Sequence, residues 1–242
     1  MIFAAGLGTR LGELTRTTPK ALVPVAGIPM LERVARRLIE AGVGRLVVNV
    51  HHHADQIVDF IRRRDGFGVD YAVSYEADQP LDTGGGLKHA ARLFEGEGPF
   101  FIHNVDIISR IPLREMYAAH RENAVDPVAT LAVMERPTMR YLLFDELGLV
   151  GREDETKSLR FLVRPVAGDV RRLPFGGVHV VSRAVFELLP ARDVFSINDV
   201  YLDAVSAGYT VAPYEVEAEG WVDIGSPERL AAAERLLEER GS

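Results

Sequence analysis

Short apolar runs alternate with amphipathic segments through the first half of the chain, and this alternation constrains the fold more than any other feature. The apolar runs have strand length and cover residues 1–5, 45–50, 69–75 and 100–105. The amphipathic segments between them predict helices over residues 29–41, 55–64 and 87–94. Because such alternation builds βαβ units, we predict an α/β protein with a Rossmann-like, mostly parallel central sheet and helices on both faces. Ligands should then bind beyond the carboxyl ends of its strands.

The pattern changes near residue 125, where shorter strand candidates alternate with charged, turn-rich stretches. Strands are predicted over residues 128–134, 141–144 and 176–181, and helices over 183–189, 197–207 and 227–239. Ser226 is the expected N-cap of the last helix, with Pro227 at its first position. No repeat or linker interrupts the chain, so we predict one domain over residues 1–242. Because the first strand starts at Met1 itself, a few native residues are expected to precede it.

Charge and composition narrow the possible partners. The chain has 28 Lys plus Arg, 35 Asp plus Glu, a net charge of -7 and no cysteine, so disulfides and cysteine-bound zinc are excluded. An acidic chain without an apolar run of about 18 residues is expected to be cytoplasmic and to bind neither nucleic acid nor membrane. Residues 1–50 nevertheless carry seven basic and three acidic side chains. This basic segment could therefore hold a small phosphorylated ligand.

A glycine-rich loop follows the first predicted strand. Gly6 and Gly8 allow the backbone to turn sharply and to present N–H groups to an anion. Leu11 stands where the dinucleotide fingerprint requires its third glycine, which argues against a nicotinamide dehydrogenase. The Gly-Lys-Ser/Thr end of a P-loop is also absent. Neither common phosphate-binding fold fits the loop.

Four separated motifs resemble those of the sugar-1-phosphate nucleotidyltransferases. They are Gly6-x-Gly8-Thr9-Arg10 with Pro19-Lys20, Leu81-Asp82-Thr83-Gly84-Gly85-Gly86, Asn104-Val105-Asp106, and Trp221-Val222-Asp223-Ile224-Gly225-Ser226-Pro227. The resemblance implies a single GT-A-like nucleotidyltransferase domain. Residues 1–125 would form its nucleotide-binding half and residues 126–242 its sugar-phosphate-binding half.

The resemblance also implies a set of site residues. The implied catalytic residues are Arg10 and Lys20, which would act on phosphates, and the implied Mg²⁺ ligands are Asp106 and Asp223. The implied nucleotide contacts are Ala5, Gly6, Leu7, Gly8, Thr9, Glu76, Asp82, Thr83 and Gly84. The implied sugar contacts are Asn104, Gly177 and Asn198. Such a site suits the chemistry, since the sugar phosphate is already an anion near pH 7 and needs charge stabilisation rather than a base.

Several of these residues also have structural readings. Asp106 and Asp223 could cap helices or turns, Asn198 could start a helix, and the glycines at 84–86 could belong to a plain flexible loop. Val105 departs from the family pattern, which usually has glycine before the first aspartate. The histidines at 51–53 are expected to be structural or solvated, because adjacent strand residues point to opposite faces.

The expected reaction joins a nucleoside triphosphate to a sugar 1-phosphate with release of pyrophosphate. UTP with N-acetylmuramate 1-phosphate, or a related sugar, is the leading substrate pair, and GTP with mannose 1-phosphate is the alternative. A sensor that binds nucleotide or sugar phosphate without turnover is the competing function from another class. The sequence leaves the oligomeric state open.

Overall fold

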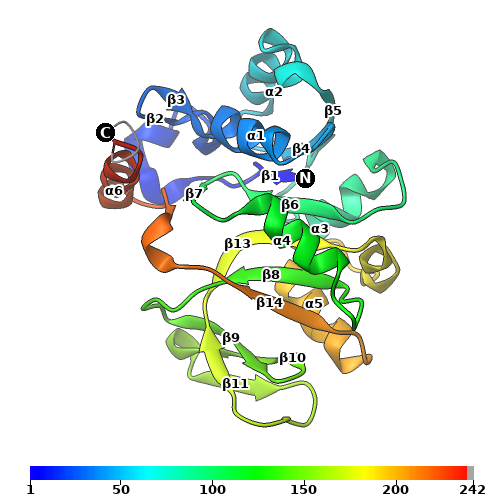
Figure 1. Ribbon diagram of the computed structural model, residues 1–242. Coiled ribbons are helices and arrows are strands. Elements are labelled where there is room, and N and C mark those ends of the chain that lie inside the picture. The colour runs from blue at the N-terminus through cyan, green and yellow to red at the C-terminus, as the bar shows by residue number, and fades with distance from the viewer. Residues whose placement is uncertain (239–242) are drawn as a thin grey trace.

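A seven-stranded mixed sheet forms the centre of the protein in a computed structural model that describes residues 1–238 (Figure 1). Its order is β14-β8-β13-β6-β1-β4-β5. The strands are β1 (Ile2–Phe3), β4 (Arg45–Val50), β5 (Asp70–Tyr75), β6 (Phe100–Asn104), β8 (Ala129–Val133), β13 (Phe175–Val181) and β14 (Val211–Glu215). Only β13 runs antiparallel to its neighbours, and because it does so to both β6 and β8, these two run in the same direction. The carboxyl ends of β1, β4, β6 and β8 therefore share one edge.

Helices cover both faces of this sheet, as the sequence predicts. They are α1 (Met30–Glu40), α2 (Ala54–Arg63), α3 (Asp82–Ala90), α4 (Leu113–Arg121), α5 (Ile197–Ser206) and α6 (Pro227–Glu238). One core cluster joins Leu31 of α1, Ile57 of α2 and Met116 of α4. The other joins Leu87 of α3 and Tyr201 of α5 on the opposite face. Each face of the sheet is thus buried by side chains of its own helix layer.

Several predicted boundaries differ from the structure. The strand predicted over residues 1–5 is reduced to β1, because the backbone N–H of Ala4 donates to the Asn49 side chain instead of to a strand. Pro29 pairs with Pro24 in the hairpin of β2 (Pro24–Val25) and β3 (Ile28–Pro29), so α1 begins after it. Residues 183–188 form a 3₁₀ helix. The predicted end of the last helix at Glu239 lies outside the described residues.

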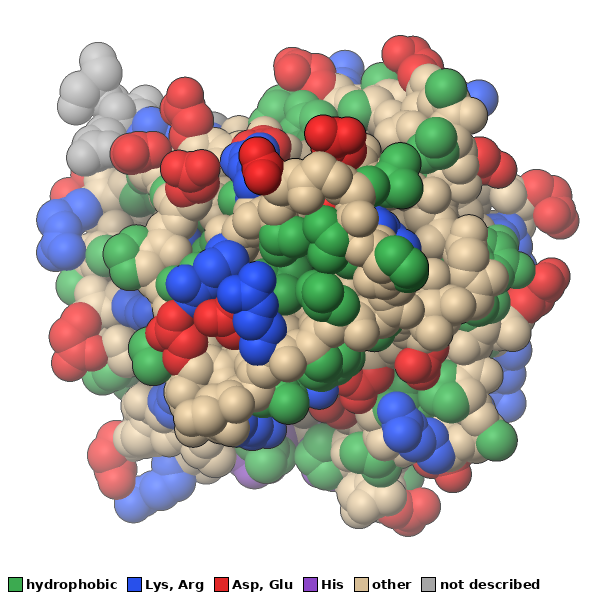
Figure 2. Space-filling view, turned by 90° about the horizontal axis from the view of Figure 1, so that it is seen from below, with side chains coloured by type: hydrophobic (Ala, Val, Ile, Leu, Met, Phe, Trp, Pro, Cys, Tyr) green, Lys and Arg blue, Asp and Glu red, His purple; other side chains and the backbone are tan. Residues whose placement is uncertain are grey.

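A second, smaller sheet lies below the main one in Figure 1 and was only partly predicted. Its order is β11-β10-β9-β12, with β9 (Arg140–Asp145), β10 (Gly148–Asp154), β11 (Leu159–Leu162) and β12 (Arg171–Leu173). Figure 2 shows the molecule from this side, where basic and acidic side chains mix around hydrophobic ones. The separate pair of β7 (Ile107–Ser109) and β15 (Trp221–Asp223) joins the two halves of the sequence. Within residues 1–238, no helix combines the length and the apolar character that a membrane crossing requires.

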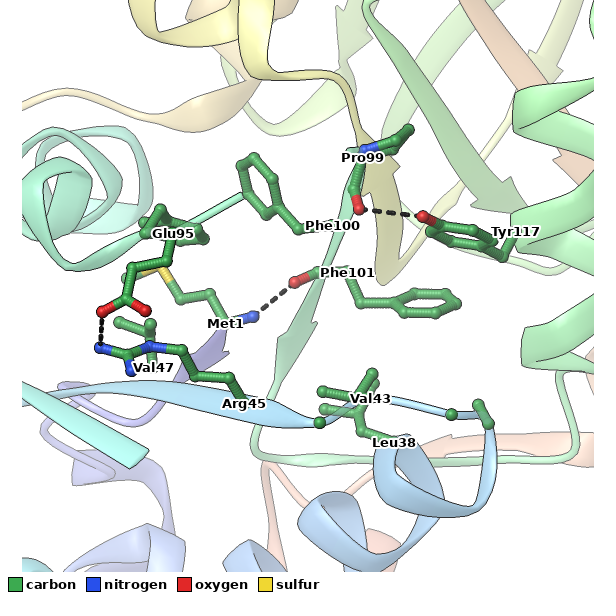
Figure 3. A pocket seen from close by; sticks show the side chains of 14 residues that line it. Met1, Leu38, Val43, Arg45, Val47, Glu95, Pro99, Phe100, Phe101 and Tyr117 are labelled. Carbon is green, nitrogen blue, oxygen red and sulfur yellow. Dashed lines mark hydrogen bonds and ion pairs between the residues drawn. The ribbon is translucent and has the colours of Figure 1, made fainter. Parts of the chain in front are cut away.

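A cavity of about 350 Å³ opens at the amino ends of the parallel strands (Figure 3). Two of its polar groups are paired: the Met1 amino group donates to the Phe101 carbonyl at 2.5 Å, and Arg45 lies 2.9 Å from Glu95. The buried Arg45 Nε has no hydrogen-bond partner among residues 1–238. This edge is opposite to the one where parallel sheets bind ligands. We therefore place no chemistry there.

Three buried histidines should make the stability of the fold depend on pH. Burial lowers the pKa of His103 and of His120 to about 4 and that of His179 to about 3, against an ordinary value of 6.5. At a pH between the lowered pKa values and the ordinary value, the unfolded chain binds protons that the folded chain does not, so acid favours unfolding. We expect the free energy of unfolding to fall between pH 6.5 and 5, by up to about 1.4 kcal/mol per pH unit for each histidine.

Urea denaturation at a series of pH values measures this slope. His103→Gln should reduce it, whereas His89→Gln, at an exposed position, should change it little. A free energy of unfolding that stays constant between pH 6.5 and 5 would contradict the assignment of neutral buried histidines.

Candidate active site

A cavity of about 400 Å³ lies at the edge where the carboxyl ends of β1 and β6 meet, and we call it the glycine-loop cavity. Most of the predicted phosphate-binding and nucleotide-binding residues line it. They are Gly6, Leu7, Gly8, Thr9, Arg10, Lys20 and Thr83. The predicted sugar contact Asn104 and the predicted metal ligand Asp106 line the cavity as well. Ala5 is buried next to this loop. The cavity is therefore built from three of the four sequence motifs, with Gly225 of the fourth at its border.

Gly8 gives the loop its shape. Its φ of 67° lies in the left-handed region, and a Cβ there would lie 3.0 Å from Thr15 Cγ2 and 3.1 Å from Lys20 Cβ. The Gly8 carbonyl accepts hydrogen bonds from the Leu11 N–H at 3.0 Å and from the Thr15 hydroxyl at 2.9 Å. These contacts close the loop against the 3₁₀ turns of residues 9–15 and leave the side of Gly6 open.

Lys20 and Asp106 form an ion pair at the floor of the cavity. Lys20 Nζ lies 2.5 Å from Asp106 Oδ2, and their side chains are 11% and 24% exposed. Asp106 follows β6, and Lys20 lies in a 3₁₀ turn after Pro19. The pair thus joins the glycine-loop motif to the aspartate motif across 86 residues of sequence.

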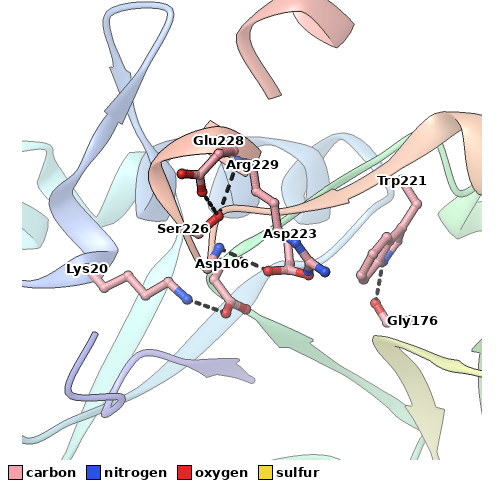
Figure 4. Close-up of polar contacts among 9 residues, drawn as sticks. Lys20, Asp106, Gly176, Trp221, Asp223, Ser226, Glu228 and Arg229 are labelled. Carbon is pink, nitrogen blue, oxygen red and sulfur yellow. Dashed lines mark hydrogen bonds and ion pairs between the residues drawn. The ribbon is translucent and has the colours of Figure 1, made fainter. Parts of the chain in front are cut away.

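Asp223 is brought beside Asp106 by the pairing of β15 with β7 (Figure 4). The Ile224 N–H donates to the Asp106 carbonyl at 2.9 Å, directly after the two strands pair. One carboxylate oxygen of Asp223 accepts a hydrogen bond from the Gly225 N–H at 2.9 Å, and the other pairs with Arg229 of α6. Asp223 therefore lies beside Asp106, which lines the cavity, and each of the two carboxylates has a cation beside it.

This pair of carboxylates suits a hard divalent cation. Mg²⁺ takes oxygen ligands and is typically held by one or two carboxylates, with substrate phosphates and water completing its octahedron. No group of three or more histidine, cysteine, aspartate or glutamate side chains within residues 1–238 is arranged to hold a metal ion. His51 and His53 instead lie against the backbone carbonyls of Glu76 and Arg16. The donor set fits a cation that arrives with phosphates and not one held by protein alone.

The glycines of the Leu81–Gly86 motif have a different structural role from the one predicted from the sequence. They lie inside α3 and are buried, so they do not form an open loop before a helix. A Cβ would lie 2.4 Å from the Phe195 ring at Gly84 and 2.0 Å from the Asp193 carbonyl oxygen at Gly85. The Gly84 N–H donates to the Phe195 carbonyl at 2.9 Å and is not free for a base. These glycines let the segment before α5 approach α3 closely.

Gly85→Ala is therefore expected to destabilise the fold by about 1–3 kcal/mol, the usual cost of overpacking. The new methyl group would overlap the Asp193 carbonyl and push α3 away from residues 193–195. Thermal denaturation measures the loss, and Gly44→Ala is the matched control because its Cβ would meet no atom within 4 Å. Equal melting temperatures for the two variants would show that this packing is not needed.

Two residues at the start of α3 lie between cavities. Asp82, with a φ of 59°, lines a second cavity, and Thr83 lines the glycine-loop cavity. The Asp82 carboxylate accepts a hydrogen bond from the Thr83 N–H at 2.6 Å. The Thr83 hydroxyl accepts one from the Ile197 N–H at 2.9 Å and so ties α3 to α5. The start of α3 separates the two cavities.

Glu76 is buried and holds neighbouring elements together. Its carboxylate accepts hydrogen bonds from the Asn49 side chain at 2.6 Å and from the Leu81 N–H at 2.8 Å. Asn49 in turn accepts the Ala4 N–H at 2.8 Å. Both carboxylate oxygens of Glu76 are thus used to fix the start of the glycine loop relative to α3.

The second cavity, of about 550 Å³, lies between the small sheet and α5, and we call it the small-sheet cavity. Asn198 lines it, and its Oδ1 atom is buried without a hydrogen-bond partner among residues 1–238. Gly177 lies nearer the glycine-loop cavity: its φ is 74°, and a Cβ there would lie 2.9 Å from Asn104 Nδ2. The predicted sugar-contact residues are therefore divided between the two cavities.

Some residues around the site belong to none of the four sequence motifs. Asn49 is the last residue but one of β4, and Arg136 lies three residues after β8, both at the edge where the carboxyl ends of the strands meet. The strand-end rule could have found them once the strand directions were known. Arg229 could not be found in this way, because it reaches Asp223 from one turn inside α6. Val105 lines the cavity but is buried, with its N–H bonded to the Phe3 carbonyl.

Comparison with known proteins agrees with this geometry. The family model for nucleotidyl transferases matches residues 1–240. An N-acetylmuramate alpha-1-phosphate uridylyltransferase of Caulobacter vibrioides is 36% identical, over 99% of this chain and 96% of its own length. A mannose-1-phosphate guanyltransferase of Yarrowia lipolytica is 28% identical over 94% of this chain, which spans only 60% of that relative.

Solved structures share the fold. HddC from Yersinia pseudotuberculosis superposes with a TM-score of 0.75 at 23% identity, covering 98% of this chain and 97% of its own. The inositol-1-phosphate CTP transferase from T. maritima has a TM-score of 0.76 at 19% identity, covering 98% and 94%. At these sequence identities the structural similarity shows a shared fold and nothing about activity.

Proposed function

The chain belongs to the nucleotidyl transferase family and is a sugar-1-phosphate nucleotidyltransferase, and from that premise we propose that it joins UTP to N-acetylmuramate 1-phosphate. The products are the UDP sugar and pyrophosphate. The observation that carries the proposal is the full-length similarity to the uridylyltransferase relative, since the guanyltransferase relative extends well beyond this chain. GTP with mannose 1-phosphate is the alternative pair.

In the proposed reaction, an oxygen of the sugar phosphate attacks the α-phosphorus of the triphosphate in line. The bond from this phosphorus to the oxygen that bridges it to the β-phosphate breaks, and pyrophosphate leaves with the electron pair. The nucleophile is already an anion near pH 7, so no side chain has to remove a proton from it. The chain's own contribution is to position two polyanions and to stabilise the charge that develops between them.

We assign the phosphates of the nucleotide to the glycine-loop cavity. The backbone of residues 6–9 and the exposed Arg10 side chain would bind the β- and γ-phosphates, and Lys20 would contact the phosphates that react. Thr83 and Asp82 would border the base, with Glu76 and Gly84 acting through packing that holds this segment in place. Residues 1–125 would thus bind most of the nucleotide.

Asp106 and Asp223 are the proposed Mg²⁺ ligands. When bound, the cation would neutralise phosphate charge and orient the two substrates. The cations now paired with these carboxylates, Lys20 and Arg229, are then free to contact phosphate oxygens. This arrangement holds both carboxylates in place before the substrates arrive.

The sugar is assigned to the small-sheet cavity in the second half of the chain. The unpartnered Oδ1 of Asn198 calls for a donor such as a sugar hydroxyl or amide. Asn104 and Gly177 lie on the side toward the glycine-loop cavity, where the acceptor phosphate must approach.

Pyrophosphate release with each of four nucleoside triphosphates and a panel of sugar 1-phosphates tests the proposal. We expect turnover to require a divalent cation and to be fastest with UTP and N-acetylmuramate 1-phosphate. Faster turnover with GTP and mannose 1-phosphate would select the alternative pair. Tight binding of a nucleotide by calorimetry without turnover of any pair would favour a sensor and overturn the proposal.

A further inference from the structure

Arg136 is held against an aromatic ring in the wall of the small-sheet cavity. It lies three residues after β8, and its guanidinium carbon lies 4.3 Å from the centre of the Trp221 ring. The Trp221 indole N–H donates to the Gly176 carbonyl at 2.7 Å, which fixes the ring (Figure 4). A guanidinium stacked on a fixed ring loses little further freedom when it binds a ligand.

Arg136 has no counter-ion in the part of the chain that the structure describes. No hydrogen bond or ion pair joins it to any of residues 1–238, and its Nε atom is buried without a partner. Burial, reinforced by the positive charge of Arg229, lowers the pKa of its guanidinium below the ordinary value. Its positive charge is therefore partly desolvated and is balanced by no carboxylate.

The neighbouring arginines of the small sheet differ in this respect. Arg152 lies 2.7 Å from Asp199, Arg140 lies 3.4 Å from Asp154, and Arg172 lies 3.0 Å from Glu153. Each of these cations is neutralised within the protein. Arg136 alone among these four arginines keeps a charge that a ligand can balance.

The position of Arg136 indicates which kind of anionic group on a ligand could balance its charge. It lines the small-sheet cavity, together with Asn198 and the Phe175 ring, and not the glycine-loop cavity that contains Lys20 and Asp106. An acceptor whose phosphate reacts beside Lys20 would therefore present a different group to Arg136. The planar fork of a guanidinium matches a carboxylate well, and a hydrogen bond between charged groups is stronger than one between neutral groups.

We propose that Arg136, stacked on Trp221, binds a carboxylate of the acceptor, so that the enzyme selects an acidic sugar 1-phosphate over a neutral one. The proposal rests on the proposed function and narrows its substrate class. N-acetylmuramate carries such a carboxylate on a lactyl ether, whereas N-acetylglucosamine has the same ring without it. The two 1-phosphates therefore form a matched pair of acceptors.

Steady-state kinetics with both acceptors tests the proposal. Arg136→Gln should lower kcat/KM for N-acetylmuramate 1-phosphate by about 10- to 100-fold, mainly through KM, and change kcat/KM for N-acetylglucosamine 1-phosphate less than about 3-fold. Arg136→Lys keeps the positive charge without the planar guanidinium, so its kcat/KM for N-acetylmuramate 1-phosphate should lie between those of the wild type and Arg136→Gln. Arg171→Gln removes a nearby arginine that is paired with Glu215 and is the matched control. Thermal melting checks that each variant is folded.

The outcomes separate this proposal from the proposed function. Equal losses for the two acceptors would place Arg136 at the phosphate, and unchanged kinetics would leave it without a substrate role; either result overturns the carboxylate assignment. A wild-type enzyme that prefers the neutral acceptor overturns the assignment but keeps a nucleotidyltransferase. A wild-type enzyme that uses no sugar 1-phosphate overturns both.

Discussion

Asp106→Asn and Asp223→Asn are each expected to reduce turnover by about 10³-fold while leaving the protein folded. Asp106 lines the glycine-loop cavity, and the hydrogen bond from the Ile224 N–H to the Asp106 carbonyl brings Asp223 beside it. Removing one charge weakens the proposed hold on Mg²⁺, and a lost electrostatic contact in an active site costs about 10²–10³ in rate, with the cation adding to this. Asparagine keeps the shape of each side chain, so packing should change little.

Pyrophosphate release at several Mg²⁺ concentrations measures the effect. Calorimetry with Mn²⁺ and a non-hydrolysable nucleotide adds a readout that does not depend on turnover. Asp203→Asn, at an exposed position of α5, is the matched control. Normal activity in either Asp106→Asn or Asp223→Asn would show that the metal assignment is wrong.

Lys20→Ala is expected to lower kcat by about 10²–10³-fold, with a much smaller change in the affinity for nucleotide. If Lys20 contacts the reacting phosphates, its charge matters most when negative charge builds up on the leaving pyrophosphate. The lysine is 11% exposed and lies 2.5 Å from Asp106, so its charge acts at short range in a partly dry site. A residue of this kind changes kcat more than KM.

Single-turnover kinetics and nucleotide titration separate the two effects for Lys20→Ala. Arg16→Ala is the matched control, since it removes a basic side chain that is 73% exposed and belongs to the same basic segment. A loss confined to nucleotide affinity would make Lys20 a uniform binding group and not a group that stabilises the transition state.

Much of the site could be predicted from local sequence, because its motifs encode local geometry. Glycines after an apolar strand predict a loop that exposes backbone, and Gly8 does adopt a φ of 67°. Asp106 was expected at the carboxyl end of a central strand, and it is the second residue after β6. The alternation of strands and helices likewise predicted a central sheet with helices on both faces. These features depend on neighbours within a few residues, which a single sequence contains.

Other features depend on pairings that no local pattern encodes. The β7 and β15 strands have three residues each, too few for a clear hydrophobic period, yet their pairing brings Asp223 to Asp106. Gly84 in α3 was predicted to contact the nucleotide, but Gly84 and Gly85 lie against residues 193–195, far along the chain. The small sheet was missed in part because its strands alternate irregularly between charged and apolar residues.

The sequence alone determined the class of protein and most of the candidate phosphate-binding residues, since turns, strand ends and motif order are local properties. Tertiary structure decided which charges meet and which remain unbalanced. Long-range strand pairing brings Asp106 and Asp223 together. Arg136 is a candidate for substrate selection because neighbouring arginines such as Arg152 pair with carboxylates, whereas Arg136 pairs with none in the described residues. The physical reason is that charge compensation depends on distances in space, and these are set by sheet order and packing.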